Sequence, residues 1–136
     1  NRDEDKENHN LRQKNHHAQL LAQVSQSIKA FFDDLRARGL ADRVLLMTFC
    51  EFGRRVHENY SEGTDHGSSA QMLLAGPGVQ GGIHGGKPIL TDLDDGDIRM
   101  ATDFRSVYAA VLSGWLRVNA TGILHSDYAP VPILRR

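Results

Sequence analysis

Four side chains that could take part in chemistry follow the apolar run of residues 44–49: Glu51, Arg54, Asp65 and His66. A carboxylate such as Glu51 can bind a metal ion or act as a general base. Asp65 and His66 stand side by side, and a carboxylate with an imidazole is a ligand pair suited to zinc or manganese. The pattern predicts a metal site formed by Glu51, Asp65 and His66.

Two consecutive arginines, Arg54 and Arg55, lie between the glutamate and the Asp-His pair. A guanidinium group matches the geometry of a phosphate or sulfate oxyanion, so we expect Arg54 to contact substrate. Two plainer interpretations remain open at this point. Glu51 could form an ion pair with Arg54 or Arg55 that fixes the loop, and the Asp-His pair could be a surface turn.

Other reactive residue types carry weaker predictions. His84 lies in the glycine-rich segment 76–87, where a solvent-exposed position is the usual one. That segment lacks the Lys-Ser/Thr ending of a phosphate-binding P-loop, and this argues against nucleotide binding. Cys50 adjoins Glu51, whose charge disfavours a thiolate, so we do not expect a nucleophile there.

The elements that must position these residues can be read from the apolar pattern. Residues 16–38 show apolar side chains at three- and four-residue spacing, which predicts an amphipathic helix ending at Gly39. Residues 44–49 and 71–75 are short apolar runs typical of strands covered on both faces, with 51–67 as a loop between them. A second helix should begin after a cap at Thr102 or Asp103 and end near residues 116–119.

This order of elements predicts an α/β fold with a mostly parallel sheet. Ligands in such sheets bind beyond the carboxyl ends of the strands, where Glu51 would lie. Few strands are predicted, so others are expected from outside this chain, and an exposed sheet edge would favour a homo-oligomer. Residues 1–15 are polar and are expected to form a flexible arm before the domain of residues 16–136, whose proline-containing tail should cross the surface.

Composition excludes several classes of function. The chain has 136 residues, 16 basic and 17 acidic, for a net charge of −1, which gives no electrostatic reason to expect nucleic acid as a partner. No apolar run approaches the roughly 20 residues of a membrane span. The single cysteine excludes an internal disulfide and a cysteine-rich zinc site. No signal peptide is present in this sequence.

Four motifs together resemble the domain-of-unknown-function 1501 family, a sulfatase-like branch of the alkaline phosphatase superfamily. They are Thr-Phe-Cys-Glu-Phe-Gly-Arg at 48–54, Gly-Thr-Asp-His-Gly at 63–67, Gly-Gly-x-His-Gly at 81–85 and Thr-Asp-Phe-Arg-Ser-Val-Tyr at 102–108. The resemblance runs from about residue 13 to the end and corresponds to the C-terminal part of that family.

The resemblance implies the C-terminal portion of a three-layer α/β/α alkaline-phosphatase-like fold and metal-dependent hydrolysis of phosphate or sulfate esters. Zinc, manganese, calcium or magnesium would be held by Glu51 and by His66 with Asp65 beside it. The nucleophile would come from an N-terminal region, so no catalytic residue is assigned here and the chain by itself is expected to be inactive. The alternative is a non-catalytic α/β binding or scaffold module. Resemblance also implies an exported or periplasmic protein.

One motif departs from the family pattern. The family shows Asp-Thr-His before the long helix, where this chain has Asn8, His9 and Asn10. Either both ligands are replaced by asparagine, or the alignment slips and His9 takes one role. Both readings count against a complete metal site.

Overall fold

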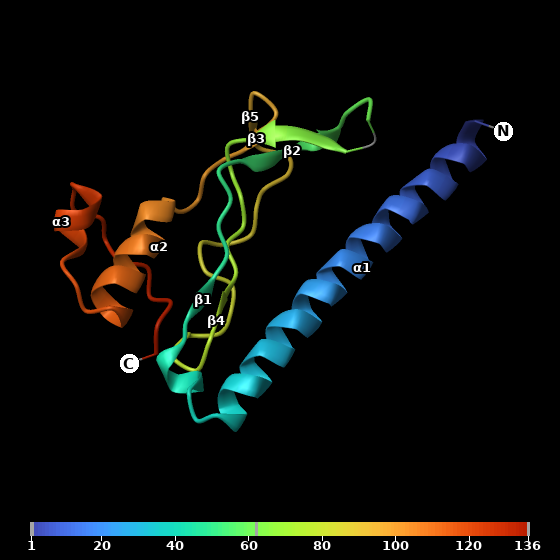
Figure 1. Ribbon diagram of the computed structural model, residues 1–136. Helices are drawn as coiled ribbons and strands as arrows, with labels where there is room; N and C mark the ends of the chain where they lie inside the picture. The colour runs from blue at the N-terminus through green and yellow to red at the C-terminus, as the bar shows by residue number, and fades with distance from the viewer. Residues whose placement is uncertain (1, 62, 136) are drawn as a thin grey trace. The chain divides into compact units, whose positions relative to one another are not determined.

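The computed structural model describes residues 2–61 and 63–135, with side chains described from residue 16 onward. These residues divide into two compact units, Asn1–Arg43 and Val44–Arg136. The first unit holds one long helix and a short 3-10 turn, and the second holds the strands and the remaining helices (Figure 1).

The first unit consists of α1 (Arg2–Ala37) and η1 (Ala41–Arg43). The helix predicted at residues 16–38 is confirmed, but it begins much earlier. Residues 2–15, expected as an arm, continue the same helix, because their Glu, Lys, Arg and Gln content favours helical backbone. The family-based reading of Asn8, His9 and Asn10 concerns side chains outside the described set and stays a prediction.

The end of α1 is set by Gly39, as the sequence predicted. Its φ of 66° is left-handed backbone that glycine adopts without a Cβ penalty. The Gly39 N–H donates to the Arg36 carbonyl at 3.0 Å, and the Leu40 N–H donates to the Leu35 carbonyl at 2.8 Å. These two bonds form a Schellman motif and satisfy carbonyls that the helix end would leave unpaired. Among the described residues, no helix is both long and apolar enough to cross a bilayer.

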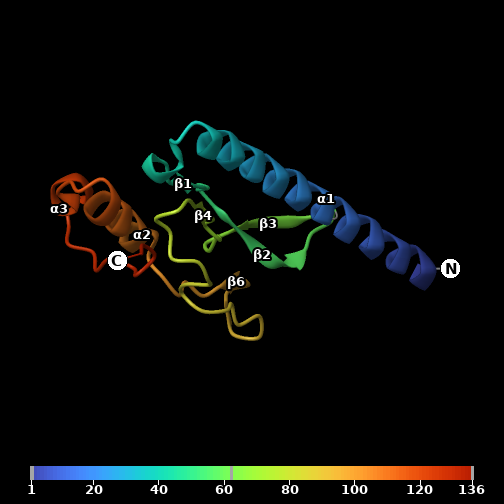
Figure 2. The ribbon, with the colours of Figure 1, turned by 90° about the horizontal axis from the view of Figure 1, so that it is seen from below.

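The described part of the second unit contains six short strands. They are β1 (Leu46–Met47), β2 (Gly53–Glu58), β3 (Thr64–Gly67), β4 (Leu74–Ala75), β5 (Leu93–Asp94) and β6 (Asp97–Ile98). The described strands pair as β1 with β4, β2 with β3 and β5 with β6, each as a two-stranded antiparallel sheet. Figure 2 shows β2 beside β3 from a second direction.

The predicted three-layer α/β/α fold with a mostly parallel sheet is therefore wrong for the described chain. The runs at 44–49 and 71–75 do form strands, but they pair with each other, Leu46 opposite Ala75 and Met47 opposite Leu74. The run was read as buried on both faces, whereas Phe49 is 75% exposed. A short apolar run is consistent with either strand type, so its composition could not fix the direction of pairing. Pairing with a second copy through a sheet edge stays a prediction.

The hydrophobic core of the second unit lies where α2 meets the C-terminal tail. Val107, Ala110 and Ile133 are buried together. The partly buried side chains around them come from β1, from β4 and the residues before it, from the turn after α2 and from the tail: Met47, Met72, Leu74, Val111, Val131 and Leu134. The tail was expected to cross the surface. Instead Ile133 is 3% exposed and fills the core.

The helix predicted after residue 102 is α2 (Phe104–Ala110), with Asp103 as its cap. The Asp103 carboxylate accepts from the Arg105 backbone N–H at 2.9 Å and from its guanidinium at 2.6 Å. The guanidinium bond first, and the backbone bond second, lower the pKa of the Asp103 carboxyl. The helix continues into a π-helical turn, η2 (Val111–Trp115), and is followed by α3 (Ala120–Leu124), capped by Asn119.

Candidate functional site

The segment 51–67, predicted as a loop, contains the β2–β3 hairpin. In its register Gly53 pairs with Gly67 and Arg54 with His66, and after an irregularity Glu58 pairs with Thr64. The close approach at its base depends on glycine, because a Cβ added to Gly53 would lie 1.7 Å from the Ser69 carbonyl oxygen. The hairpin is the element that places most of the predicted site residues.

Pairing across this hairpin brings Arg54 and His66 to one face. Residues directly opposite each other in an antiparallel pair have Cβ atoms about 5 Å apart on the same side of the sheet. The Arg54 Nη1 group donates to the Thr64 carbonyl at 2.6 Å, which holds the guanidinium over β3. Both Arg54 and His66 are exposed. A cation and an imidazole are thus neighbours on one accessible surface.

Phe52 adds an aromatic ring to this surface, and sequence reasoning missed it. Its ring stacks on the His66 imidazole with centroids 3.6 Å apart and planes 12° from parallel. The Arg54 Cζ atom lies 5.2 Å from the Phe52 ring centroid, within cation–π range. The available signal was the spacing of Phe52 and Arg54, because residues two apart on a strand share a face. We name Phe52, Arg54 and His66 the stacked cluster.

Arg55 points to the opposite side, toward the β5–β6 hairpin. Its guanidinium lies 3.8 Å from carboxylate oxygens of both Asp95 and Asp97. Asp97 also accepts from the Ser68 backbone N–H at 3.2 Å. Strand alternation therefore separates the two arginines, one facing the stacked cluster and the other engaged with acidic side chains.

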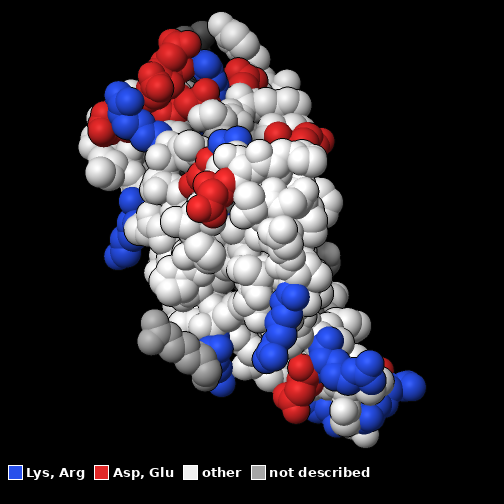
Figure 3. Space-filling model, turned by 90° about the vertical axis from the view of Figure 1, so that its left-hand side faces the viewer, with Lys and Arg blue, Asp and Glu red and all other residues white. Residues whose placement is uncertain are grey.

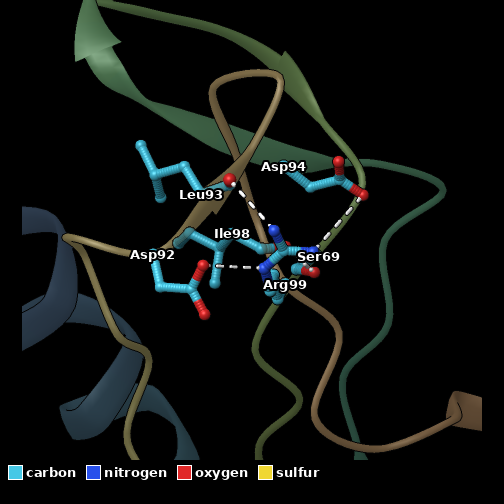
Figure 4. Close-up of polar contacts among 6 residues, drawn as sticks. All are labelled: Ser69, Asp92, Leu93, Asp94, Ile98 and Arg99. Carbon is cyan, nitrogen blue, oxygen red and sulfur yellow. Dashed lines mark hydrogen bonds and ion pairs between the residues drawn. The ribbon is translucent and has the colours of Figure 1, made fainter.

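The β5–β6 hairpin is fixed by polar contacts of its own (Figure 4). Arg99 pairs with Asp92 at 2.9 Å and lies 3.9 Å from Asp94. The Ser69 hydroxyl donates to the Ile98 carbonyl at 2.6 Å, which joins the end of the β2–β3 segment to β6. The acidic segment of residues 92–97 is thus a hairpin whose carboxylates are largely engaged by arginines.

Glu51 lies in a bend before β2 and is exposed. Its carboxylate accepts a hydrogen bond from the Cys50 thiol, whose sulfur lies 3.6 Å from the Glu51 Oε2 atom. Within the described residues neither Arg54 nor Arg55 forms an ion pair with Glu51, so the loop-fixing alternative finds no support.

Asp65 and His66 are neighbours on β3, and successive side chains of a strand leave opposite faces. Asp65 accepts a hydrogen bond from the Asn59 amide at 2.8 Å, while His66 stacks on Phe52. In the part of the chain that the structure describes, no group of three or more His, Cys, Asp or Glu side chains is placed to hold a metal ion. The donors present do not fit a metal centre by themselves.

Charge elsewhere does not form a patch of one sign. On the face in Figure 3, acidic side chains gather near the upper end with basic ones among them, basic side chains lie lower down, and a wide uncharged area lies between. His84 is exposed, and its Nε2 atom lies 3.0 Å from the Gln80 carbonyl oxygen, as expected of a histidine in a surface loop. The stacked cluster is therefore the best-defined arrangement of chemically capable side chains in the described unit.

Comparison with known proteins relates most of the chain to a protein family. The family model described as "Protein of unknown function (DUF1501)" matches residues 7–113. No significant match to a curated protein or to a solved structure was found.

Proposed function

The chain belongs to the DUF1501 family of proteins of unknown function, and from this premise we propose that it binds phosphate or sulfate esters through the stacked cluster without hydrolysing them by itself. The oxyanion would lie against the exposed face of the β2–β3 hairpin. Arg54 supplies the positive charge and His66 a further N–H donor.

The observation that carries this proposal is the direct pairing of Arg54 with His66 across the hairpin. A guanidinium group has five N–H donors, and Arg54 donates from its Nη1 group to the Thr64 carbonyl. That bond orients the group while other N–H donors stay available to an anion. Charge-assisted bonds to phosphate or sulfate oxygens are about twice as strong as neutral ones.

Binding is proposed in place of turnover because of where the carboxylates lie. Metal-dependent hydrolysis was implied by family resemblance with Glu51, Asp65 and His66 as ligands. The Asp65 side chain projects from the opposite face of the strand to His66 and accepts a hydrogen bond from the Asn59 amide. The Glu51 carboxylate accepts a hydrogen bond from the Cys50 thiol. Such an arrangement favours the non-catalytic binding module over the hydrolase for this chain.

Calorimetric titration at low ionic strength tests the proposal, with sulfate, methyl phosphate and phenyl phosphate as ligands. Arg54→Ala should weaken binding about tenfold or more, because a charge-assisted hydrogen bond contributes roughly 1.5–3 kcal/mol. Arg55→Ala is the matched control, since it removes the same charge from the adjacent position on the other face. We expect its affinity to stay within about twofold, and chelation with EDTA to change nothing.

Equal losses in the two arginine variants would contradict the proposal, because they would indicate non-specific attraction by net charge. Hydrolysis of phenyl phosphate or phenyl sulfate that stops on chelation would also contradict it. That outcome would favour the metal-dependent hydrolase, with Glu51→Gln and His66→Ala as the next variants.

A further inference from the structure

Phe52 contacts both other side chains of the stacked cluster, Arg54 and His66. We propose that Phe52 is the positioning residue of the anion site, and that its ring holds the His66 imidazole and the Arg54 guanidinium in the orientation that receives an oxyanion. This inference rests on the proposed function, because it concerns the same site.

The contact with His66 fixes the plane of the imidazole. With centroids 3.6 Å apart and planes only 12° from parallel, the two rings overlap face to face. One face of the imidazole is then covered, while the bonding directions of both ring nitrogens lie in the ring plane, nearly parallel to the Phe52 ring. An exposed histidine without such a contact would sample several rotamers and would lose that freedom on binding an anion.

The contact with Arg54 restrains the guanidinium from a second direction. Its Cζ atom lies 5.2 Å from the Phe52 ring centroid, and its Nη1 group is bonded to the Thr64 carbonyl. A long arginine side chain without such contacts loses rotamer entropy when a ligand orders it. Because these two contacts order the guanidinium before binding, the entropy loss no longer weakens the affinity for an anion.

The backbone beside Phe52 holds the ring in turn. Gly53 is buried, and its Cα lies so close to the Ser69 backbone that no side chain fits between them. Gly67, opposite Gly53 in the register, is also confined, because an added Cβ would lie 2.8 Å from the Arg54 carbonyl carbon. Phe52 is half-buried and cannot shift along the hairpin without displacing this base.

Proton NMR combined with sulfate titration of the full chain tests the role of Phe52. In the wild-type protein, the ring current of Phe52 should move the His66 ring protons upfield. Phe52→Leu should abolish that shift and weaken sulfate binding about five- to tenfold, whereas Phe52→Tyr should retain both. Phe49→Leu is the matched control, because Phe49 is a phenylalanine three positions before Phe52 in the chain and is 75% exposed.

Two results would overturn the inference while leaving the proposed function in place. One is a Phe52→Leu variant that loses the His66 shift but binds sulfate within twofold of wild type. The other is a wild-type protein that binds sulfate but shows no upfield shift of His66. If wild-type protein binds no sulfate, phosphate or ester at all, the proposed function itself fails, and the inference fails with it.

Discussion

Replacing Gly53 with alanine should lower the thermal unfolding midpoint by roughly 10 °C or more. The added Cβ would lie 1.7 Å from the Ser69 carbonyl oxygen and 2.2 Å from its carbonyl carbon, both backbone atoms that cannot rotate away. Inserting a methyl group into such a contact forces the backbone apart and costs about 3 kcal/mol. Circular dichroism during heating measures the shift.

Gly81→Ala is the control for this substitution, because an added Cβ at Gly81 meets nothing within 4 Å. Its unfolding midpoint should stay within about 2 °C of wild type. An equally stable Gly53→Ala variant would mean that β2 and the segment after β3 are not packed as the structure has them. The positions of Phe52 and Arg54 would then need revision.

Ile133→Ala should destabilise the second unit by about 2–5 kcal/mol. Ile133 is 3% exposed and lies against Val107 and Ala110, so the truncated side chain would leave a cavity in the core. The backbone around it is held by a bond from the Gln80 N–H to the Ile133 carbonyl at 2.8 Å, which limits collapse of the site. Chemical denaturation followed by Trp115 fluorescence measures the loss.

Ile83→Ala removes the same atoms from a side chain that is 77% exposed, and we expect a change below about 0.5 kcal/mol. Similar effects of the two substitutions would show that the tail is not part of the core. The tail would then lie on the surface, as its prolines suggested from sequence.

The helices were the most predictable part of the fold, because local chemistry determines where they begin and end. Gly39 ends α1 and Asp103 caps α2, both as the sequence indicates. The start of α1 was placed too late, since a polar segment without an apolar stripe gives no periodic signal even when its residues favour helix.

Sheet pairing could not be read from the same sequence. An apolar run such as residues 44–49 fits a buried parallel strand or one strand of a small antiparallel pair, and only tertiary contacts decide between them. The β5–β6 turn carried a clearer signal. Asp95 and Gly96 both have positive φ, as an Asp-Gly hairpin turn requires.

At the site, the residue types were more informative than their predicted grouping. Asp65 and His66 were grouped as ligands because they are adjacent and flanked by glycines, on the assumption of a loop. Strand geometry separates adjacent side chains and joins residues across the hairpin, so His66 lies with Arg54. The spacing of Phe52 and Arg54 was a signal in the sequence, but it points to a shared face only if these residues lie on a strand, and the segment was predicted as a loop.

The most direct test of the account is a side-chain NMR titration of the wild-type protein with sulfate. The central claim is that Arg54 and His66 receive one oxyanion together. We predict that the Arg54 Nε–H and His66 ring signals shift along one common binding curve, while those of Arg55 and His84 stay in place. The claim would be contradicted if the Arg54 and Arg55 signals shifted to the same extent. It would also be contradicted if neither the Arg54 nor the His66 signals shifted.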